Sequence, residues 1–239
     1  MLAALAATAT VTGLAAGGYA YAAMWPTSQI FGRTIIAGRD PNEYALTYDD
    51  GPNDACTEQI LEILDRHGVR ASFFVIGRFV RQRGDLVRRI RAAGHIVGNH
   101  TMTHPRLLFK SPRKVREELV STSAVIEDAI GEKVTYFRPP HGARRPDVLR
   151  TARELGLVPV LWNAMSYDWK TPTAELILAN LDRKIRSNRR RGMGSNLLLH
   201  DGGQAGIGQD RKATVAATEA LLARALPQNV RFVTLDKWG

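Results

Sequence analysis

The chain has 239 residues, of which 44% are hydrophobic, and this suits one large domain or at most two small ones with a sizeable core. Its formal net charge is +10 and its pI is near 10.2, so its charge is compatible with nucleic acid, an anionic membrane surface or an anionic cell-wall polymer. The single cysteine, Cys56, excludes an intramolecular disulfide and a metal site built from cysteines.

The first 32 residues, MLAALAATATVTGLAAGGYAYAAMWPTSQIFG, contain no charged residue, and a small-residue AYA stretch lies at 20–22. This pattern predicts that residues 1–32 are a signal peptide and that the protein is exported. An uncleaved membrane anchor or a segment of the mature protein stays open, because the segment is long enough to cross a bilayer but only weakly apolar. We expect the working domain at 33–239, in the periplasm, outside the cell or facing outward from the membrane.

Short β-rich runs alternate with helical patterns from residue 43 onward. The expected strands lie at 44–50, 71–77, 95–101, 134–140, 157–163, 196–202 and 230–236. The expected helices lie at 57–68, 78–93, 111–131, 145–156, 171–187 and 212–226; Gly closes several of them, and Ser-Pro or Thr-Pro opens two. The alternation indicates parallel βα units, arranged as an open doubly wound sheet or as a barrel.

Polar residues at or just after the ends of different expected strands favour the barrel. These residues are Asp49, Asp50, His100, His104, Arg138, Asp168 and His200. In a parallel barrel the C-terminal ends of the strands converge on one face, where such folds build their active sites. We therefore predict an α/β fold, a distorted (β/α) barrel of about seven parallel strands in a single domain.

Two Arg-rich segments, 77–94 and 181–192, carry apolar residues at helical spacing. They are typical of the solvated faces of amphipathic helices. No aromatic residues interleave with the arginines, and no zinc-finger or RNA-binding motif is present. We therefore expect no nucleic-acid partner.

The stretch YALTYDDGPND places Asp49 and Asp50 side by side at the end of an expected strand. Side chains alternate along a strand, so one of the two carboxylates would face the core, where an isolated charge is costly. Either the strand has already ended and both acids lie in a solvated turn, or a nearby cation makes the placement favourable.

His100 and His104 are four residues apart, so on one helical turn both imidazoles would face the same way and could share a cation. The pair lacks the neighbouring Glu of the zincin motif and is weak evidence alone. Two imidazoles and one carboxylate, however, form a common three-ligand set for a catalytic divalent ion. One Asp of the adjacent pair would then bind the metal, and the other would remain free as a base.

Three further motifs supply candidate residues. In YFRPPHGARR, Arg138 could hold the free Asp ionised, and a backbone N–H near His141 could donate to an oxyanion. In SYDWKTP, Asp168 precedes Trp169, whose flat ring could stack on a sugar. In NLLLHDGG, His200 ends a buried strand, a position that also suits a purely structural histidine.

Taken together, TYDDGP, HTMTH, RPPHG, DW and LLLH resemble, in order and spacing, the motifs of the polysaccharide deacetylase family, carbohydrate esterase family 4, over residues 43–236. The resemblance implies a distorted (β/α) barrel and metal-dependent hydrolysis of N-acetyl or O-acetyl groups on a glycan. It implies Asp49 as the general base, Arg138 as the residue that orients it, and His200 as the general acid, assisted by Asp168. The implied metal ligands are Asp50, His100 and His104, and the implied substrate-binding residues are His141, Trp169 and Leu197.

The implied cofactor is a divalent metal, zinc first, with cobalt, manganese or nickel as alternatives. The expected partner is an acetylated polysaccharide such as peptidoglycan or a chitin-like chain, with membrane anchoring through the N-terminus as an option. Tyr48 stands where the family often has Phe, and His141 where it often has Tyr, which leaves substrate preference open. The alternatives are an O-acetyl xylan esterase, another amide hydrolase of the same fold, or a catalytically silent glycan-binding module. The sequence leaves the oligomeric state open.

Overall fold

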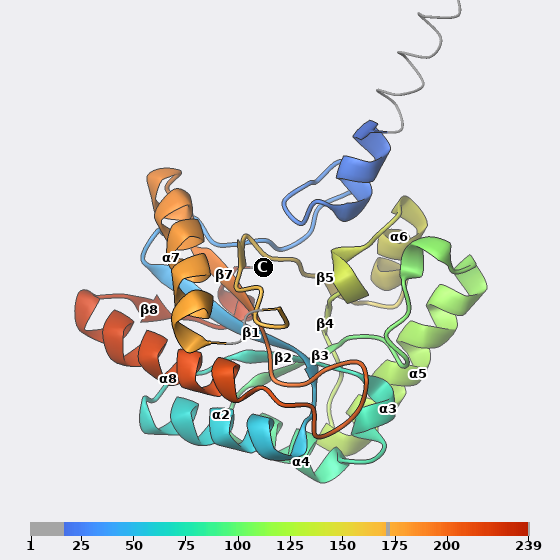
Figure 1. Cartoon of the computed structure of the whole chain (residues 1–239). Helices are drawn as coiled ribbons and strands as arrows, with labels where there is room; N and C mark the ends of the chain where they lie inside the picture. The colour runs from blue at the N-terminus through green and yellow to red at the C-terminus, as the bar shows by residue number, and fades with distance from the viewer. Residues whose placement is uncertain (1–16, 171–172, 239) are drawn as a thin grey trace, which may run out of the picture.

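A parallel β-sheet curls through the centre of the molecule in a computed structural model that describes residues 17–170 and 173–238, and helices pack around its outside (Figure 1). The strands are β1 (Glu43–Gly51), β2 (Ser72–Val75), β3 (Ile96–Asn99), β4 (Tyr136–Phe137), β5 (Val158–Pro159), β6 (Ala164–Met165), β7 (Ser195–His200) and β8 (Arg231–Phe232). Their order is β5-β4-β3-β2-β1-β7-β6, and β8 pairs with β1. The paired strands run parallel.

Helices connect most consecutive strands and cover the outer face of the sheet. They are α2 (Asp54–Arg66), α3 (Gly77–Val80), α4 (Gly84–Ala92), α5 (Pro112–Ile130), α6 (Pro146–Glu154), α7 (Ala174–Arg190) and α8 (Lys212–Ala225). Short 3-10 turns lie at η1 (Leu107–Phe109), η2 (Pro140–Gly142), η3 (Leu226–Gln228) and η4 (Leu235–Lys237). This alternation confirms the predicted α/β fold and its parallel βα units.

The barrel is open, because the path of paired strands begins at β5 and ends at β6. The sheet has eight strands where about seven were expected, since the two-residue strand β6 follows the run predicted at 157–163 and pairs with β7. The helix expected at 78–93 is divided into α3 and α4, because Arg83 between them leaves the helical conformation (φ −132°, ψ 47°). The expected distorted barrel is therefore confirmed, with these local corrections.

The main hydrophobic core lies between the sheet and the outer helices. It includes Leu46, Phe73, Ile60, Leu119 and Leu222. Tyr48 belongs to this core: its ring stacks on Phe73, and its hydroxyl lies 2.9 Å from Thr218 Oγ1 on α8. Tyr48, at the position where the family often has Phe, therefore faces the helix layer.

The N-terminal segment enters above the strands β4 and β5 in the view of Figure 1. Residues 17–24 are helical, and Ala22, Ala23 and Ser28 are buried. Residues 1–16, half of the predicted signal peptide or anchor, lie outside the described residues, and the boundary at residue 33 stays a prediction. Within 17–170 and 173–238, no helix has the length and apolarity needed to cross a membrane.

Candidate active site and metal centre

A pocket of about 420 Å³ opens at the C-terminal ends of the strands. Its lining includes seven of the residues predicted from the sequence: Asp49, Asp50, His100, His104, His141, Trp169 and His200. The convergence of these residues from separate strand ends is the arrangement expected for an active site in a parallel barrel.

An irregularity in β1 brings both adjacent carboxylates to the pocket. Asp49 pairs with Phe74 of β2, but the register then shifts, and Gly51 pairs with Val75. Asp50, the extra residue at this bulge, has a left-handed conformation with φ of 70°. The alternation of a regular strand is therefore broken at this point, and both acids can face the same pocket.

Asp50, His100 and His104 form a compact set of potential metal ligands. Asp50 Oδ1 lies 3.4 Å from His100 Nε2 and 3.1 Å from His104 Nε2. One ligand atom from each of the three buried residues lies within 4.8 Å of the others. The predicted ligand set is thus brought together in space.

The loop that carries the two histidines is not a helical turn, which corrects the geometry suggested by their spacing. Thr101 and His104 both have positive φ, 67° and 58°. The loop is held by side chains: Asn99 Oδ1 accepts from the Thr101 N–H at 2.9 Å, and Thr101 Oγ1 accepts from the His104 N–H at 3.1 Å. The imidazoles still meet, with ring centroids 4.9 Å apart, because this loop turns His104 back toward His100.

Each of the two imidazoles is hydrogen-bonded through Nδ1, so its Nε2 atom remains directed at the centre of the site. His100 Nδ1 lies 2.8 Å from the carbonyl oxygen of Arg138, and His104 Nδ1 lies 2.8 Å from Gln204 Oε1. Both partners are acceptors, so Nδ1 carries the proton, and Nε2 presents its lone pair. Asp50 Oδ1 is buried without a hydrogen-bond partner among the described residues. An orphaned carboxylate oxygen beside two imidazole lone pairs fits a divalent cation.

The electrostatics of His104 and Asp50 suit the same role. Burial opposes the charged form of His100, but the carboxylates of Asp49 and Asp50 outweigh it and raise the pKa of this imidazole. Burial, together with the neighbouring His100, lowers the pKa of the His104 imidazole to about 4, which favours the neutral form that binds metals. Burial disfavours the charged form of Asp50, but the adjacent His100 and the other nearby imidazoles outweigh it and lower the pKa of this carboxyl. A neutral imidazole and an ionised carboxylate are the forms in which these side chains coordinate.

Asp49 is held by Arg138, as the sequence predicted. The guanidinium NH1 donates to Asp49 Oδ1 at 2.7 Å and to Thr47 Oγ1 at 2.9 Å. Arg138 is fully buried and lies over the ring of Phe74, 4.1 Å from its centroid. This buried cation limits the rotation of the Asp49 carboxylate, because the ring and the hydrogen bonds hold the guanidinium in place.

His200 and Asp168 form a second pair across the pocket. Asp168 Oδ1 lies 2.8 Å from His200 Nδ1, and Asp168 Oδ2 accepts from the His200 backbone N–H at 2.7 Å. Ser166 and Thr214 also donate to this carboxylate, at 2.8 and 2.9 Å. Burial lowers the pKa of His200, but the Asp168 carboxylate outweighs it and raises this pKa to about 9. His200 is therefore protonated at neutral pH and can donate from Nε2.

The apolar wall of the pocket corrects one predicted residue. Leu198, with Trp162 and Met165, lines the pocket, whereas Leu197 is fully buried in the main core beneath the helices. Successive residues of β7 point to opposite faces, so a shift of one position moves a side chain from pocket to core. Trp169 remains 39% exposed beside the pocket, and its ring is 5.0 Å from that of His200.

The RPPHG loop reaches the pocket beside His104. His141 has φ of 59°, and its ring lies 4.7 Å from the ring of His104 in an edge-on arrangement. A Cβ atom on Gly142, which has φ of 67°, would lie 2.8 Å from the ring of Trp162. This glycine is required for the close approach of the loop to the pocket wall.

Sequence reasoning missed the loop 201–211, which follows β7 and closes one side of the pocket. Gln204 holds His104, and Asn53 Nδ2 donates to the carbonyl oxygens of Asp201 and Gln209 at 3.0 and 2.7 Å. Asp201 is buried behind β1, and burial raises its pKa to about 7. The Gly-rich sequence DGGQAGIG marks a loop here, but no motif marks Gln204 as the partner of a histidine.

The comparisons with known proteins agree with the geometry. The chain matches the polysaccharide deacetylase family over residues 37–160. It is 39% identical over 182 residues to the chitooligosaccharide deacetylase of Bradyrhizobium sp. (strain ANU 289), covering 76% of this chain and 80% of that protein.

Two solved structures share the fold. The Bc1960 peptidoglycan N-acetylglucosamine deacetylase aligns with a TM-score of 0.76 and 28% identity, over 86% of this chain and 91% of that one. A family 4 acetyl xylan esterase from Clostridium thermocellum, solved with a cobalt ion, aligns with a TM-score of 0.71 and 29% identity, over 82% and 89% of the two chains. The chain therefore belongs to the polysaccharide deacetylase family, as its motifs predicted, and is a hydrolase of the deacetylase class.

Proposed function

We propose that this protein removes acetyl groups from the N-acetylated sugars of a glycan in a metal-dependent hydrolysis. One observation carries the proposal: a carboxylate held by a buried arginine, Asp49, and a protonated histidine, His200, flank one three-ligand site in a single pocket. A base and an acid on either side of a cation are what amide hydrolysis requires.

Asp50, His100 and His104 would hold the divalent ion. Their mixed nitrogen and oxygen donors favour zinc, with cobalt, manganese or nickel as alternatives. When bound, the ion supplies a Lewis acid for the acetyl carbonyl and lowers the pKa of a water molecule. The hydrogen bonds from Nδ1 of both histidines keep their Nε2 atoms directed at this point.

Asp49 accepts the proton of the attacking water. The hydrogen bond from Arg138 occupies Oδ1 of this carboxylate, so Oδ2 is the oxygen that faces the ligand set, 3.7 Å from His100 Nε2. The buried guanidinium fixes the direction of this oxygen.

His200 protonates the leaving amine. An amide nitrogen leaves poorly without a proton, and the raised pKa of His200 keeps that proton available at neutral pH. Asp168 holds Nδ1, so Nε2 is the donor toward the substrate.

The remaining pocket residues orient the acetyl group and the sugar. The backbone N–H of His141 would donate to the oxyanion, and Leu198 would contact the acetyl methyl from the apolar wall. The partly exposed Trp169 offers a flat ring on which a sugar can stack.

We propose peptidoglycan or a chitin-like chain as the substrate and export as the route to it. The relatives named above include a chitooligosaccharide and a peptidoglycan deacetylase, and the net charge of +10 favours an anionic wall polymer. The chain is also similar in structure to an acetyl xylan esterase, so an O-acetyl ester is the second candidate substrate. A silent binding module would have no need of the buried Asp49–Arg138 pair.

Acetate release tests the proposal. The zinc-loaded protein would be incubated with acetylated chito-oligomers, with peptidoglycan and with acetylated xylan, beside the Asp49→Asn variant as the inactive control. We expect release from an N-acetylated substrate and little from the control. Release from xylan alone would establish the esterase, and binding of glycan without release from any substrate would establish the silent module.

A further inference from the structure

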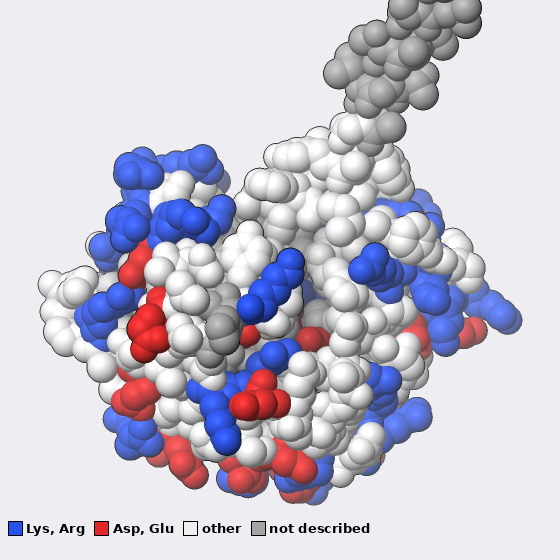
Figure 2. All heavy atoms as spheres, in the orientation of Figure 1, with Lys and Arg blue, Asp and Glu red and all other residues white. Residues whose placement is uncertain are grey.

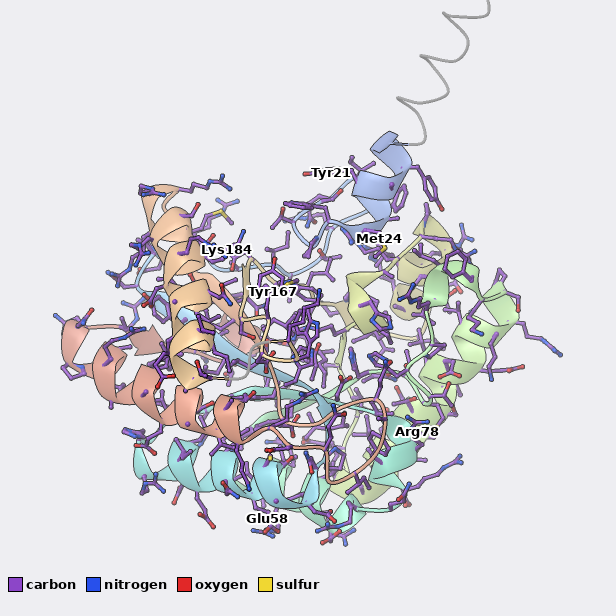
Figure 3. All side chains as sticks on the ribbon, in the orientation of Figure 1. Tyr21, Met24, Glu58, Arg78, Tyr167 and Lys184 are labelled. Atoms are coloured by element: carbon purple, nitrogen blue, oxygen red, sulfur yellow. The ribbon has the colours of Figure 1, made fainter. Side chains whose placement is uncertain are left out.

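The N-terminal collar, residues 19–31, presents an unusual concentration of exposed apolar side chains. Five of the eleven large hydrophobic side chains that are exposed in the described chain lie here: Tyr19, Tyr21, Met24, Trp25 and Ile30. Trp25 and Ile30 are 54% and 67% exposed. Figure 3 shows Tyr21 projecting outward from the helical turn. Exposed apolar surface of this extent marks a contact site.

A buried arginine fixes the collar to the catalytic domain. Arg144, only 1% exposed, donates to the carbonyl oxygens of Trp25 and Ser28 at 2.7 and 2.9 Å. Its backbone N–H donates to the carbonyl oxygen of Ala23 at 3.1 Å. A buried guanidinium needs these acceptors, so residues 23–28 are part of the folded domain. Cleavage after Ala22, at the AYA stretch, would leave every one of them in place.

The same arginine belongs to the loop that lines the pocket. Arg144 NH1 donates to the carbonyl oxygen of Gly142, the residue after His141, at 3.0 Å. The collar is thereby held at a fixed position relative to the pocket. Whatever surface the collar contacts will set the orientation of the active site.

Positive charge accompanies the apolar collar on the same side of the molecule. Exposed Arg33 lies two residues after the end of the collar. Figure 2 shows Lys and Arg gathered over the upper end of α7, at about the height of the uncharged collar in this view. Arg186 and Arg190 on this end of α7 are exposed and have no carboxylate partner among the described residues. The two features together form a surface with aromatic groups on one side and unpaired cations on the other.

We infer that this surface rests on a lipid bilayer that contains anionic headgroups. Trp and Tyr are the side chains that favour the boundary between hydrocarbon and water, and arginines beside them match anionic lipids in charge. Residues 1–18, which precede the collar, contain no charged side chain that would oppose the approach of the collar to lipid. The enzyme would then work on polymer that lies close to the membrane surface.

Vesicle binding of the full chain tests the apolar part of the surface. The variant Trp25→Ser/Ile30→Ser alters two collar positions that lie beyond the AYA stretch, so the test holds whether or not the chain is cleaved there. The control Val120→Ser/Leu176→Ser alters two exposed apolar residues on α5 and in the first turn of α7. We expect the collar variant to partition about tenfold more weakly into phosphatidylcholine–phosphatidylglycerol vesicles, and the control to bind like the parent.

A second pair of variants tests the cationic part of the surface, and the two variants have the same net charge as each other. Arg186→Gln/Arg190→Gln should weaken binding by about fivefold per arginine in these vesicles, and the effect should vanish with pure phosphatidylcholine. Arg81→Gln/Arg88→Gln removes the same charge from exposed positions at α3 and α4 and should bind like the parent. Equal losses in both variants would show a general charge effect and overturn the assignment to this surface.

Fluorescence gives an independent readout of position. Brominated lipids should quench part of the tryptophan emission of the parent, and Trp25→Tyr should remove most of that quenching. Equal quenching in parent and variant would overturn the proposal, because another tryptophan would then contact the lipid. A collar variant that binds vesicles normally but changes from dimer to monomer in sedimentation would also overturn it and identify the collar as a contact between two copies.

Discussion

The Nδ1 atom of His104 lies 2.8 Å from the side-chain oxygen of Gln204, a residue 100 positions further along the chain. Gln204 is itself tied to α3, because Arg78 donates to its backbone carbonyl oxygen; Figure 3 shows Arg78 on that helix. The loop after β7 therefore directs a proposed metal ligand that belongs to the loop after β3. The orientation of His104 depends on a tertiary contact rather than on the HTMTH motif alone.

Gln204→Met should weaken metal binding while it preserves the shape of the side chain. Loss of the acceptor frees the His104 ring to rotate and to change tautomer, and such outer partners typically contribute 10- to 100-fold in affinity. Gln204→Glu keeps an acceptor oxygen and should remain close to the parent. Competition with a chromophoric chelator measures the dissociation constants. Equal affinities in parent and Gln204→Met would show that the loop around His104 orients the ring without help from Gln204.

The sequence predicted the fold where local signals decide the structure. The helix expected at 111–131 is observed at Pro112–Ile130, because Ser111 caps its first turn by accepting from the Lys114 N–H and Gly131 ends it with φ of 74°. The polar residues at strand ends were brought together as expected, because parallel strands present their C-terminal ends on one face.

Other features depend on contacts that the sequence does not display. Leu197 and Leu198 look alike in NLLLH, and only the pairing of β7 with its neighbours decides which leucine faces the pocket. The bulge at Asp50 is likewise a property of the β1–β2 register. Gln204 and Arg144 act on segments more than ninety positions away in the chain, beyond the reach of periodicity or motif.

Asp168→Asn should move the alkaline limit of amide hydrolysis to lower pH. In the proposed mechanism His200 acts in its protonated form, so activity should fall as the pH rises through its pKa, which the Asp168 carboxylate raises to about 9. Asparagine removes the negative charge that favours the imidazolium form of His200. A cation bound nearby also disfavours the imidazolium. The pH profile of kcat measures the shift, and thermal melting verifies that the variant is folded. An unchanged profile in a folded variant would mean that His200 is not the group that titrates.

Gly51→Ala should destabilise the protein through a clash behind the site. A Cβ at residue 51 would lie 2.3 Å from Asp201 Oδ2, and Asp201 is fully buried and hydrogen-bonded to Thr57. We expect a loss of about 1–3 kcal/mol in the free energy of unfolding. Gly84→Ala is the control: it lies in α4 with no atom closer than 3.7 Å to the added Cβ, and it should be neutral or slightly stabilising. Denaturant titrations that rank the two variants equally would contradict the clash.

The two adjacent acids of β1 should fail in different ways when they are changed. Asp50→Ala removes the carboxylate whose oxygen lies between His100 and His104, so it should lose metal. Asp49→Asn keeps an oxygen that can accept from Arg138, and the three ligands stay intact, so it should retain the metal. It should nevertheless lose about 10²- to 10⁴-fold in turnover, since an amide cannot accept a proton from water. Metal content after chelation and reloading, measured beside acetate release, separates the roles. Loss of metal from Asp49→Asn with retention in Asp50→Ala would reverse the assignment, and retention of both metal and activity in the two variants would reduce the pair to a structural turn.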